Sequence, residues 1–431
     1  MHPPDRRVLS VLVPLGALAF ASAFAACHTT EDPRPGLAKR GATVTPDPLP
    51  PPIDAGIVPD ASALPPPPLE CGPAPFSTAP FTKQALLGAA ADCAAFHACT
   101  FENAATVLKK TLEAAKESSA ENRGLTQLAF RNAMSAWSSV EGFQFGPVAG
   151  KAIDKYHGRG LRALVHPWPD TSRCQVESQV GLKGYKQGFD LVFPSGRGLF
   201  ALEYLLHYPG TDTSCSAGST GGQAWSVLAR APGALQEAKQ EYALAVATDI
   251  VGTAQVLNKV WSTSGENFKA KLLAFDGYGS EQETLNVVAW SLLYPEQQIK
   301  DIKLGSLAGF QPAAPILETP FARIDIENIR TNLRAFRSLF QGCGPDGRGI
   351  GFDDWLVAAG NGALAKEIQD LFTLALSAAD GFPTFQQATP GQFSEFYLKV
   401  RPLANLLKIN FFGSASPLNL KLPASAASDT D

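Results

Sequence analysis

The stretch Ser195-Gly-Arg-Gly-Leu-Phe-Ala-Leu-Glu-Tyr-Leu-Leu-His207 carries the most informative helical pattern in this chain. Three of its leucines recur at intervals of three and four residues: Leu199, Leu202 and Leu206. Residues at these intervals share one face of an α-helix, so the stretch predicts a helix whose leucine face lies in the core. A neighbouring row on the same helix holds its chemically distinctive side chains, which are Phe200, Glu203 and His207.

The same periodicity recurs along most of the chain. Apolar residues follow it at Ile326, Ile329, Leu333, Phe336 and Phe340, and again at Leu364, Ile368, Leu371, Ala375 and Ala378. No segment shows a sustained two-residue alternation bounded by hairpin turns, so an all-α body is expected. The predicted helices span residues 102–118, 122–143, 196–208, 222–251, 281–301, 323–341, 362–379 and 391–407.

A short internal sequence repeat suggests two related helical lobes. Arg131-Asn-Ala-Met-Ser-Ala-Trp137 leads to Phe-Gly-Pro147, and Arg330-Thr-Asn-Leu-Arg-Ala-Phe336 leads to Cys-Gly-Pro345. If the repeat reflects an internal duplication, it implies two helical bundles with a cleft between them. We therefore expect an N-terminal lobe over residues 71–250 and a C-terminal lobe over residues 251–422.

The N-terminal segment has the composition of a secretory signal. Two arginines precede an apolar run that ends in Phe24-Ala-Ala-Cys27. This ending predicts a bacterial lipoprotein signal over residues 1–26, with Cys27 acylated after cleavage. A membrane-spanning helix is the alternative, because the run could nearly cross a bilayer. His28, rather than Asp, follows Cys27 and favours the outer membrane.

A proline-rich tether follows the predicted lipid anchor. Residues 27–70 contain many prolines and almost no large apolar side chains. Such a segment cannot bury enough surface to fold, so we expect a disordered spacer between the membrane and the helical body. Residues 423–431 are expected to form a disordered tail.

Six cysteines remain when Cys27 is set aside. An even number of cysteines in an exported chain favours disulfides, and fifteen pairings remain open. The candidates are Cys71, Cys93, Cys99, Cys174, Cys215 and Cys343.

Charge and motifs exclude several classes of protein. The formal net charge is −4, so a nucleic acid is not the expected partner. The chain also lacks a His-Glu-x-x-His zinc helix, a complete phosphate-binding loop and a Gly-x-Ser-x-Gly nucleophile elbow.

Several segments together resemble the imelysin family of bacterial cell-envelope proteins, over residues 78–422. Ala136-Trp-Ser-Ser-Val-Glu-Gly-Phe-Gln-Phe-Gly-Pro147 is similar to the family's tryptophan-led helix, and His166-Pro-Trp-Pro169 to its Trp-Pro element. The helix from Arg197 onward resembles the Gly-x-His-x-x-Glu signature, with Gly198 and Glu203 in place. Phe200 stands where the family has histidine.

The resemblance implies an exported, two-lobed, all-α protein associated with iron uptake, with the signature helix near the cleft. A histidine and a glutamate three residues apart on a helix suit iron, zinc or copper. Because Phe200 lacks the ligand nitrogen, Glu203 needs other ligands to retain a metal.

Two further residues are candidate ligands beside Glu203. His207 lies one turn farther along, although a histidine at a helix C-terminus is also explained by the helix dipole. Glu141 could face the signature helix, or it could pair with Arg197, which is also a candidate counter-ion for Glu203. His166 is interpreted as a packing or capping residue.

The leading hypothesis is a non-catalytic lipoprotein that binds a metal, a metal complex or a partner in the cleft between the lobes. It would lie in the cell envelope, facing the periplasm or the cell surface, and act with iron-uptake or other envelope proteins. One alternative is a metal-dependent peptidase that uses Glu203; the other is a protein-interaction module with a decayed metal site. A catalytic zinc usually needs three protein ligands, which argues against the peptidase.

Overall fold

A computed structural model describes residues 60–115, 119–413 and 416–423 of the chain. Within these ranges the secondary structure is helical and contains no strand, which confirms the predicted all-α fold. None of the helices in these ranges has the length and apolar content needed to cross a membrane. The predicted signal peptide, Cys27, the tether up to residue 59 and residues 424–431 lie outside the described residues.

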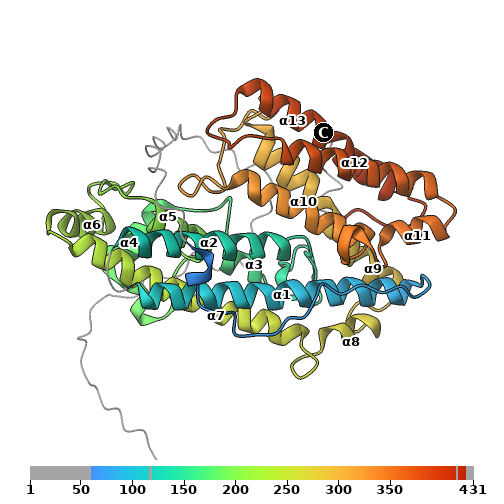
Figure 1. Cartoon of the computed structure of the whole chain (residues 1–431), viewed down its shortest axis with the longest axis horizontal. Coiled ribbons are helices and arrows are strands. Elements are labelled where there is room, and N and C mark those ends of the chain that lie inside the picture. The colour runs from blue at the N-terminus through green and yellow to red at the C-terminus, as the bar shows by residue number, and fades with distance from the viewer. Residues whose placement is uncertain (1–59, 116–118, 414–415, 424–431) are drawn as a thin grey trace, which may run out of the picture. The chain divides into compact units, whose positions relative to one another are not determined.

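The α-helices account for most of the described chain (Figure 1). In chain order they are α1 (Lys83–Ala114), α2 (Ala120–Val140), α3 (Leu161–Val165), α4 (Arg173–Leu182), α5 (Gly198–His207), α6 (Thr220–Arg230), α7 (Ala234–Trp261), α8 (Phe268–Leu273), α9 (Glu281–Ala289), α10 (Asp325–Gln341), α11 (Phe352–Ala358), α12 (Gly362–Asp380) and α13 (Pro390–Leu406).

Shorter helices of other types join them. The 3₁₀-helices are η1 (Ala61–Ala63), η2 (Gly146–Val148), η3 (Gly184–Gln187), η4 (Phe189–Leu191), η5 (Pro194–Gly196), η6 (Trp290–Leu293) and η8 (Pro345–Gly347). Two π-helices, η7 (Pro295–Gly305) and η9 (Leu407–Phe411), complete the set in the described residues.

The helices pack in two groups that contact each other. In the first group α1 lies along both α2 and α7, and α5 packs on α7 and α2. In the second group α12 packs between α10 and α13 (Figure 1). α10 also packs against α2, so the N-terminal and C-terminal parts of the body share this contact.

The predicted lobe boundary lies inside a helix. α7 runs without a break from Ala234 to Trp261 and so passes through residue 250. The division into two lobes stays a prediction.

Three predicted helices differ from the observed ones. The predicted helix 102–118 is the C-terminal part of α1, which begins at Lys83 and ends at Ala114. The predicted helix 222–251 is broken at Ala231-Pro232-Gly233, where Gly233 has a φ of 78°. Proline lacks the backbone N–H that a helix interior requires, so α6 ends and α7 begins there. The predicted helix 281–301 becomes α9, η6 and η7 in succession.

Side-chain caps define where many of the helices begin. The hydroxyl groups of Thr82, Ser119, Ser172, Ser219, Ser280 and Thr389 accept a backbone N–H from the first turn of the helix that follows. Such a cap satisfies one of the amides that helix geometry leaves without a partner.

Helix α5 is buried on nearly all sides. Leu199 and Leu202 are fully buried, as the leucine face predicts, whereas Leu206 is half-buried. Every other residue of α5 is also buried, including Phe200, Glu203 and His207. A short helix surrounded by protein on all faces holds a central place in the fold.

The six candidate cysteines form three disulfides. Their pairs are Cys71–Cys99, Cys93–Cys343 and Cys174–Cys215. The second bridge joins residues 250 positions apart, so it links α1 to the segment after α10.

Candidate metal centre

Three buried side chains from distant parts of the sequence meet beside the contact of α2 with α10. They are Glu141, His166 and Glu318, and one potential ligand atom from each lies within 4.8 Å of the other two. In the part of the chain that the structure describes, no other group of three or more such residues converges in this way. The exposed fractions of the three residues are 0%, 1% and 2%.

Each of the three residues lies where a helix ends or is about to begin. Glu141 is the C-cap residue of α2, and His166 is the C-cap residue of α3. Glu318 belongs to the segment that leads into α10. Backbone bonds keep the first two in place, because the Glu141 N–H donates to the Trp137 carbonyl and the His166 N–H to the Arg162 carbonyl.

The distances within the group are short but are not hydrogen bonds. His166 Nδ1 lies 3.8 Å from Glu318 Oε1 and 4.0 Å from Glu141 Oε1. These three atoms are buried and have no hydrogen-bond partner. Buried polar atoms without hydrogen bonds cost stability, and a single ion bound between these three would satisfy them together.

The second oxygen, Oε2, of each of the two carboxylates accepts hydrogen bonds. Glu318 Oε2 accepts from Lys303 Nζ at 2.7 Å and from Asn328 Nδ2 at 3.1 Å. Glu141 Oε2 accepts from Asn332 Nδ2 at 3.3 Å, and Lys303 Nζ also donates to Asn332 Oδ1 at 2.8 Å. One oxygen of each carboxylate is thus anchored while the other is directed at His166, which is how outer partners orient metal ligands.

Two cations balance the two carboxylates. Arg162 Nε lies 3.3 Å from Glu141 Oε1, and Lys303 pairs with Glu318. Burial alone would raise the pKa of the Glu141 carboxyl, but the adjoining His166 ring and the charge of Arg162 hold that pKa well below its ordinary value. Glu141 is therefore ionised at neutral pH, as a metal ligand must be.

The donor set suits a transition metal. Two carboxylate oxygens and one imidazole nitrogen fit iron, zinc or manganese better than a soft ion that prefers sulfur. The three convergent atoms, none of which has a hydrogen-bond partner, match such an ion, and three protein ligands would leave coordination positions open for other molecules.

Glu141 belongs to this group, whereas the other two predicted ligands lie outside it. Glu203 Oε1 accepts the backbone N–H groups of Phe321 and Ala322 at 2.7 Å and 2.8 Å. Burial raises the pKa of the Glu203 carboxyl well above its usual range. Its second oxygen is buried without a hydrogen-bond partner.

His207 occupies an apolar environment. Its ring packs edge-on against Phe130 at 5.3 Å between centroids, and its Nε2 has no hydrogen-bond partner. Burial, reinforced by the charge of Arg131, lowers the pKa of His207 to about 3. The ring is therefore neutral at physiological pH, so the helix-dipole explanation, which needs a partly protonated imidazole, does not describe it.

The prediction that Arg197 pairs with Glu203 or Glu141 is wrong. Arg197 forms an ion pair with Asp249 of α7, with Nε 3.1 Å from Oδ2, and also donates to the Phe189 carbonyl. Neither Glu203 nor Glu141 pairs with it. The cation beside Glu141 is Arg162.

Two of the three residues in the group were missed by sequence reasoning. His166 was interpreted as a packing or capping residue; it does occupy the C-cap of α3, but its ring faces two carboxylates. Glu318 lies in a Pro-containing segment without helical periodicity. The one available signal was the His166-Pro-Trp-Pro169 element, which marks a family segment without indicating a ligand.

The described chain is all-helical and contains a buried group of two glutamates and one histidine that could hold a metal ion. The Imelysin (Peptidase_M75) family model matches residues 94–398. This match spans most of the chain, and the chain belongs to the imelysin family.

Solved structures support the same fold. An imelysin-like protein from Psychrobacter arcticum 273-4 is similar with a TM-score of 0.58 and 16% identity, over 79% of this chain and 96% of that one. A putative iron-regulated protein A precursor from Parabacteroides distasonis ATCC 8503 is similar with a TM-score of 0.54 and 13% identity, over 77% of this chain and 96% of that one. No curated protein matches the sequence.

Proposed function

We propose that this chain is an imelysin-like lipoprotein of the cell envelope that takes part in iron acquisition by binding a transition-metal ion at Glu141, His166 and Glu318. One observation carries the proposal. Glu141 Oε1, His166 Nδ1 and Glu318 Oε1 converge in a buried place, and none of them has a hydrogen-bond partner. A metal ion would satisfy all three at once.

The depth of the group favours binding over peptide hydrolysis. The three residues are at most 2% exposed, so a peptide could not reach them without a large opening of the helices, whereas a metal ion is small enough to enter. Binding of the metal itself, rather than catalysis on it, is the function that this geometry supports.

The charge around the group limits what can bind. The Glu141 and Glu318 carboxylates already pair with Arg162 and Lys303, so a divalent ion would add two positive charges to a buried region. Such a charge is costly to bury unless it is compensated. We expect the metal either to displace a cation from its carboxylate or to bring an anionic ligand with it.

The envelope location and the iron link rest on separate support. Cys27 and the proline-rich tether are the proposed membrane attachment, most simply at the outer membrane. The similar protein from Parabacteroides distasonis is named as iron-regulated, and this supports a role in iron acquisition here. Other envelope proteins of iron uptake are the proposed partners.

Metal titration of the full chain tests the proposal. The protein is stripped with a chelator and titrated with Fe²⁺ under anaerobic conditions, then with Zn²⁺ and Cu²⁺, by isothermal titration calorimetry. We expect about one equivalent of iron or zinc to bind, and the affinity to fall at least about tenfold in Glu141→Gln and Glu318→Gln.

Glu296→Gln is the matched control. Glu296 is as deeply buried as the proposed ligands, but its carboxylate pairs with Lys408 at 2.8 Å. This variant should bind metal as the wild type does. An absence of metal binding, or equal affinities in all variants, would contradict the proposal. Peptide cleavage that disappears with Glu141→Gln would replace it with the peptidase alternative.

A further inference from the structure

The signature carboxylate Glu203 bonds to the segment that carries Glu318. Its Oε1 accepts two consecutive backbone N–H groups, from Phe321 at 2.7 Å and Ala322 at 2.8 Å. These amides lie three and four residues after Glu318. A single oxygen of α5 therefore holds the backbone on the C-terminal side of the proposed ligand.

A second carboxylate holds the other end of the same short segment. Asp325 Oδ1 accepts from the backbone N–H of Glu318 at 2.9 Å and from that of Thr319 at 3.0 Å. Thr319 Oγ1 also accepts from the Ile324 N–H at 3.1 Å. Residues 318–322 lack regular secondary structure, so these side chains take over the backbone bonds that a helix would provide.

Aromatic packing adds to the contact with α5. The Phe321 ring packs edge-on against Tyr204 at 5.2 Å and against Tyr208 at 5.3 Å between centroids. Tyr204 follows Glu203 directly, so one turn of α5 holds both the backbone and the side chain of Phe321. Paired aromatic rings stabilise such a contact beyond the area they bury.

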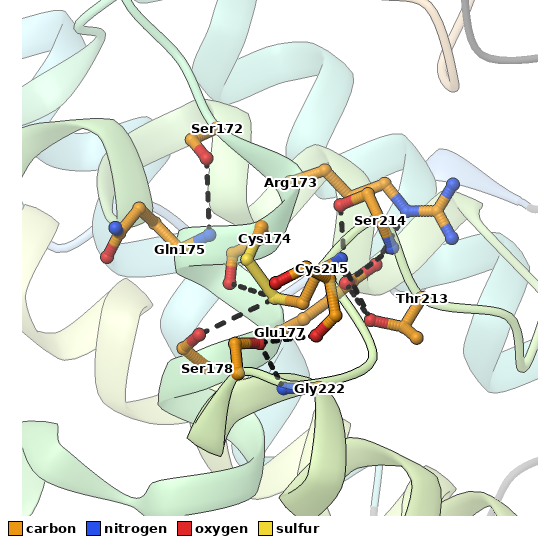
Figure 2. The surroundings of a disulfide bond; sticks show 12 residues. Ser172, Arg173, Cys174, Gln175, Glu177, Ser178, Thr213, Ser214, Cys215 and Gly222 are labelled. Carbon is orange, nitrogen blue, oxygen red and sulfur yellow. Dashed lines mark hydrogen bonds and ion pairs between the residues drawn. A yellow bond between two sulfur atoms is a disulfide. The ribbon is translucent and has the colours of Figure 1, made fainter.

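The position of Tyr204 is itself held by a buried polar network. Its hydroxyl donates to Glu177 Oε1 at 2.8 Å, and Glu177 Oε2 accepts from Thr213 and Ser214. Figure 2 shows Glu177 beside the Cys174–Cys215 disulfide, which ties the segment of Thr213 and Ser214 to α4. The hydrogen bonds of Glu177 and the disulfide therefore hold Tyr204 in the position from which it contacts Phe321.

The first residue of α5 approaches a second ligand-bearing segment. Gly198 has a φ of 72°, and a Cβ at this position would lie 2.3 Å from the carbonyl oxygen of Val165. Val165 immediately precedes His166. Glycine here permits α5 to lie directly against the end of α3.

We infer that Glu203 is a positioning residue, which sets Glu318 into the metal-binding group by holding the backbone of Phe321 and Ala322. The signature helix thus supports the site and does not supply a ligand to it. This inference rests on the proposed function, but the contact that carries it is independent of any metal.

Two substitutions of Glu203 separate positioning from ligation. Glu203→Gln keeps an oxygen that can accept both amides, whereas Glu203→Ala removes it. A positioning role predicts that Glu203→Gln binds metal within about twofold of wild type and that Glu203→Ala binds about tenfold more weakly, as losses of supporting groups do. A ligand role predicts that Glu203→Gln loses as much affinity as Glu318→Gln.

Hydrogen exchange of the metal-free protein provides the second readout. Mass spectrometry of peptides covering residues 318–324 should show faster amide exchange in Glu203→Ala, and wild-type protection in Glu203→Gln and in the control Glu296→Gln. If Glu203→Ala leaves both protection and affinity unchanged, the inference is wrong. It is also wrong if Glu203→Gln loses metal while protection persists.

The two possible failures remain distinguishable. If the wild-type protein binds no metal, the proposed function fails, while the exchange comparison still decides whether Glu203 holds the segment. If Glu203→Ala does not fold, Glu203→Gln decides alone, because the positioning and ligand roles predict opposite metal affinities for it.

Discussion

His166 Nδ1 lies 3.8 Å from Glu318 Oε1, although the two residues come from segments far apart in the chain. The imidazole reaches this place from the end of α3, and the carboxylate from the segment before α10. The contact between α2 and α10 brings Glu141 to the same point. The proposed metal centre therefore depends on how the N-terminal and C-terminal helices pack together.

Replacing Lys303 should make the stability of the protein depend on metal. Lys303→Met leaves the buried Glu318 carboxylate without its cation, which should cost about 3–5 kcal/mol of unfolding free energy in the metal-free state. The same change removes a competing positive charge, and Asn328 still holds Glu318 Oε2. Added Zn²⁺ should therefore raise the melting temperature more than it does in wild type. Differential scanning calorimetry with and without metal measures both effects.

Lys366→Met is the control for that prediction. Lys366 pairs with Asp370 on the surface, where both side chains are mostly exposed. Exposed pairs of this kind contribute about 0.5 kcal/mol or less, and no metal dependence should appear. Equal metal-induced shifts for Lys303→Met and wild type would contradict a charge competition at the site.

Gly198→Ala should destabilise the fold through a steric clash. The added Cβ would meet the Val165 carbonyl at 2.3 Å, and the φ of 72° already disfavours alanine. We expect a loss of about 2 kcal/mol or more, measured by urea denaturation. Gly233→Ala separates the two causes, since Gly233 has a φ of 78° but no atom within 4 Å of its Cβ position. If both variants lose the same stability, the close approach to Val165 has no energetic effect.

Buried His207 should make the protein less stable in acid. Burial lowers its pKa to about 3, from 6.5 in the unfolded chain. Below pH 6.5 the unfolded state therefore binds a proton that the folded state does not, so stability is fully present above pH 6.5 and is lost as the pH falls toward 3. The loss should amount to a few kcal/mol.

The comparison with His207→Phe tests this dependence. Phenylalanine fills the apolar site beside Phe130 without a titrating group. Urea denaturation at several values between pH 4 and pH 7 should show a shallower decline for this variant than for wild type. Parallel curves would mean that His207 does not titrate on unfolding in this range.

Removing single disulfides should have unequal effects. Cys93–Cys343 spans 250 residues and Cys174–Cys215 spans 41, so the longer loop restricts the unfolded chain more. The chain-entropy relation predicts that a Cys93→Ser/Cys343→Ser variant loses about 1–2 kcal/mol more than Cys174→Ser/Cys215→Ser. Thermal unfolding of both variants measures the difference, and a larger loss for the shorter loop would contradict the entropic explanation.

Local patterns in the sequence were sufficient to predict most of the long helices. Apolar residues at intervals of three and four predicted α10 and α12 closely, because a helix places these residues on one face whatever surrounds it. The same reasoning joined α6 to α7 and missed α4 and α11. Capping and packing decide such short helices, and the hydrophobic period alone does not reveal them.

The candidate site was predictable only in part. Glu141 could be proposed because it lies near a conspicuous tryptophan in a family-like segment. Glu318 has no such signal, since its role comes from Asn328, Lys303 and Asp325, which hold its side chain and backbone in place.

The sequence by itself determined that this is an all-α member of the imelysin family, with Phe200 in place of the signature histidine. Only the tertiary structure decided that Glu203 bonds to backbone amides and that Glu141 meets His166 and Glu318. The physical reason is that helical periodicity acts within one segment, whereas a ligand group forms where several segments pack against one another. The spacing of residues within one segment does not predict how different segments pack.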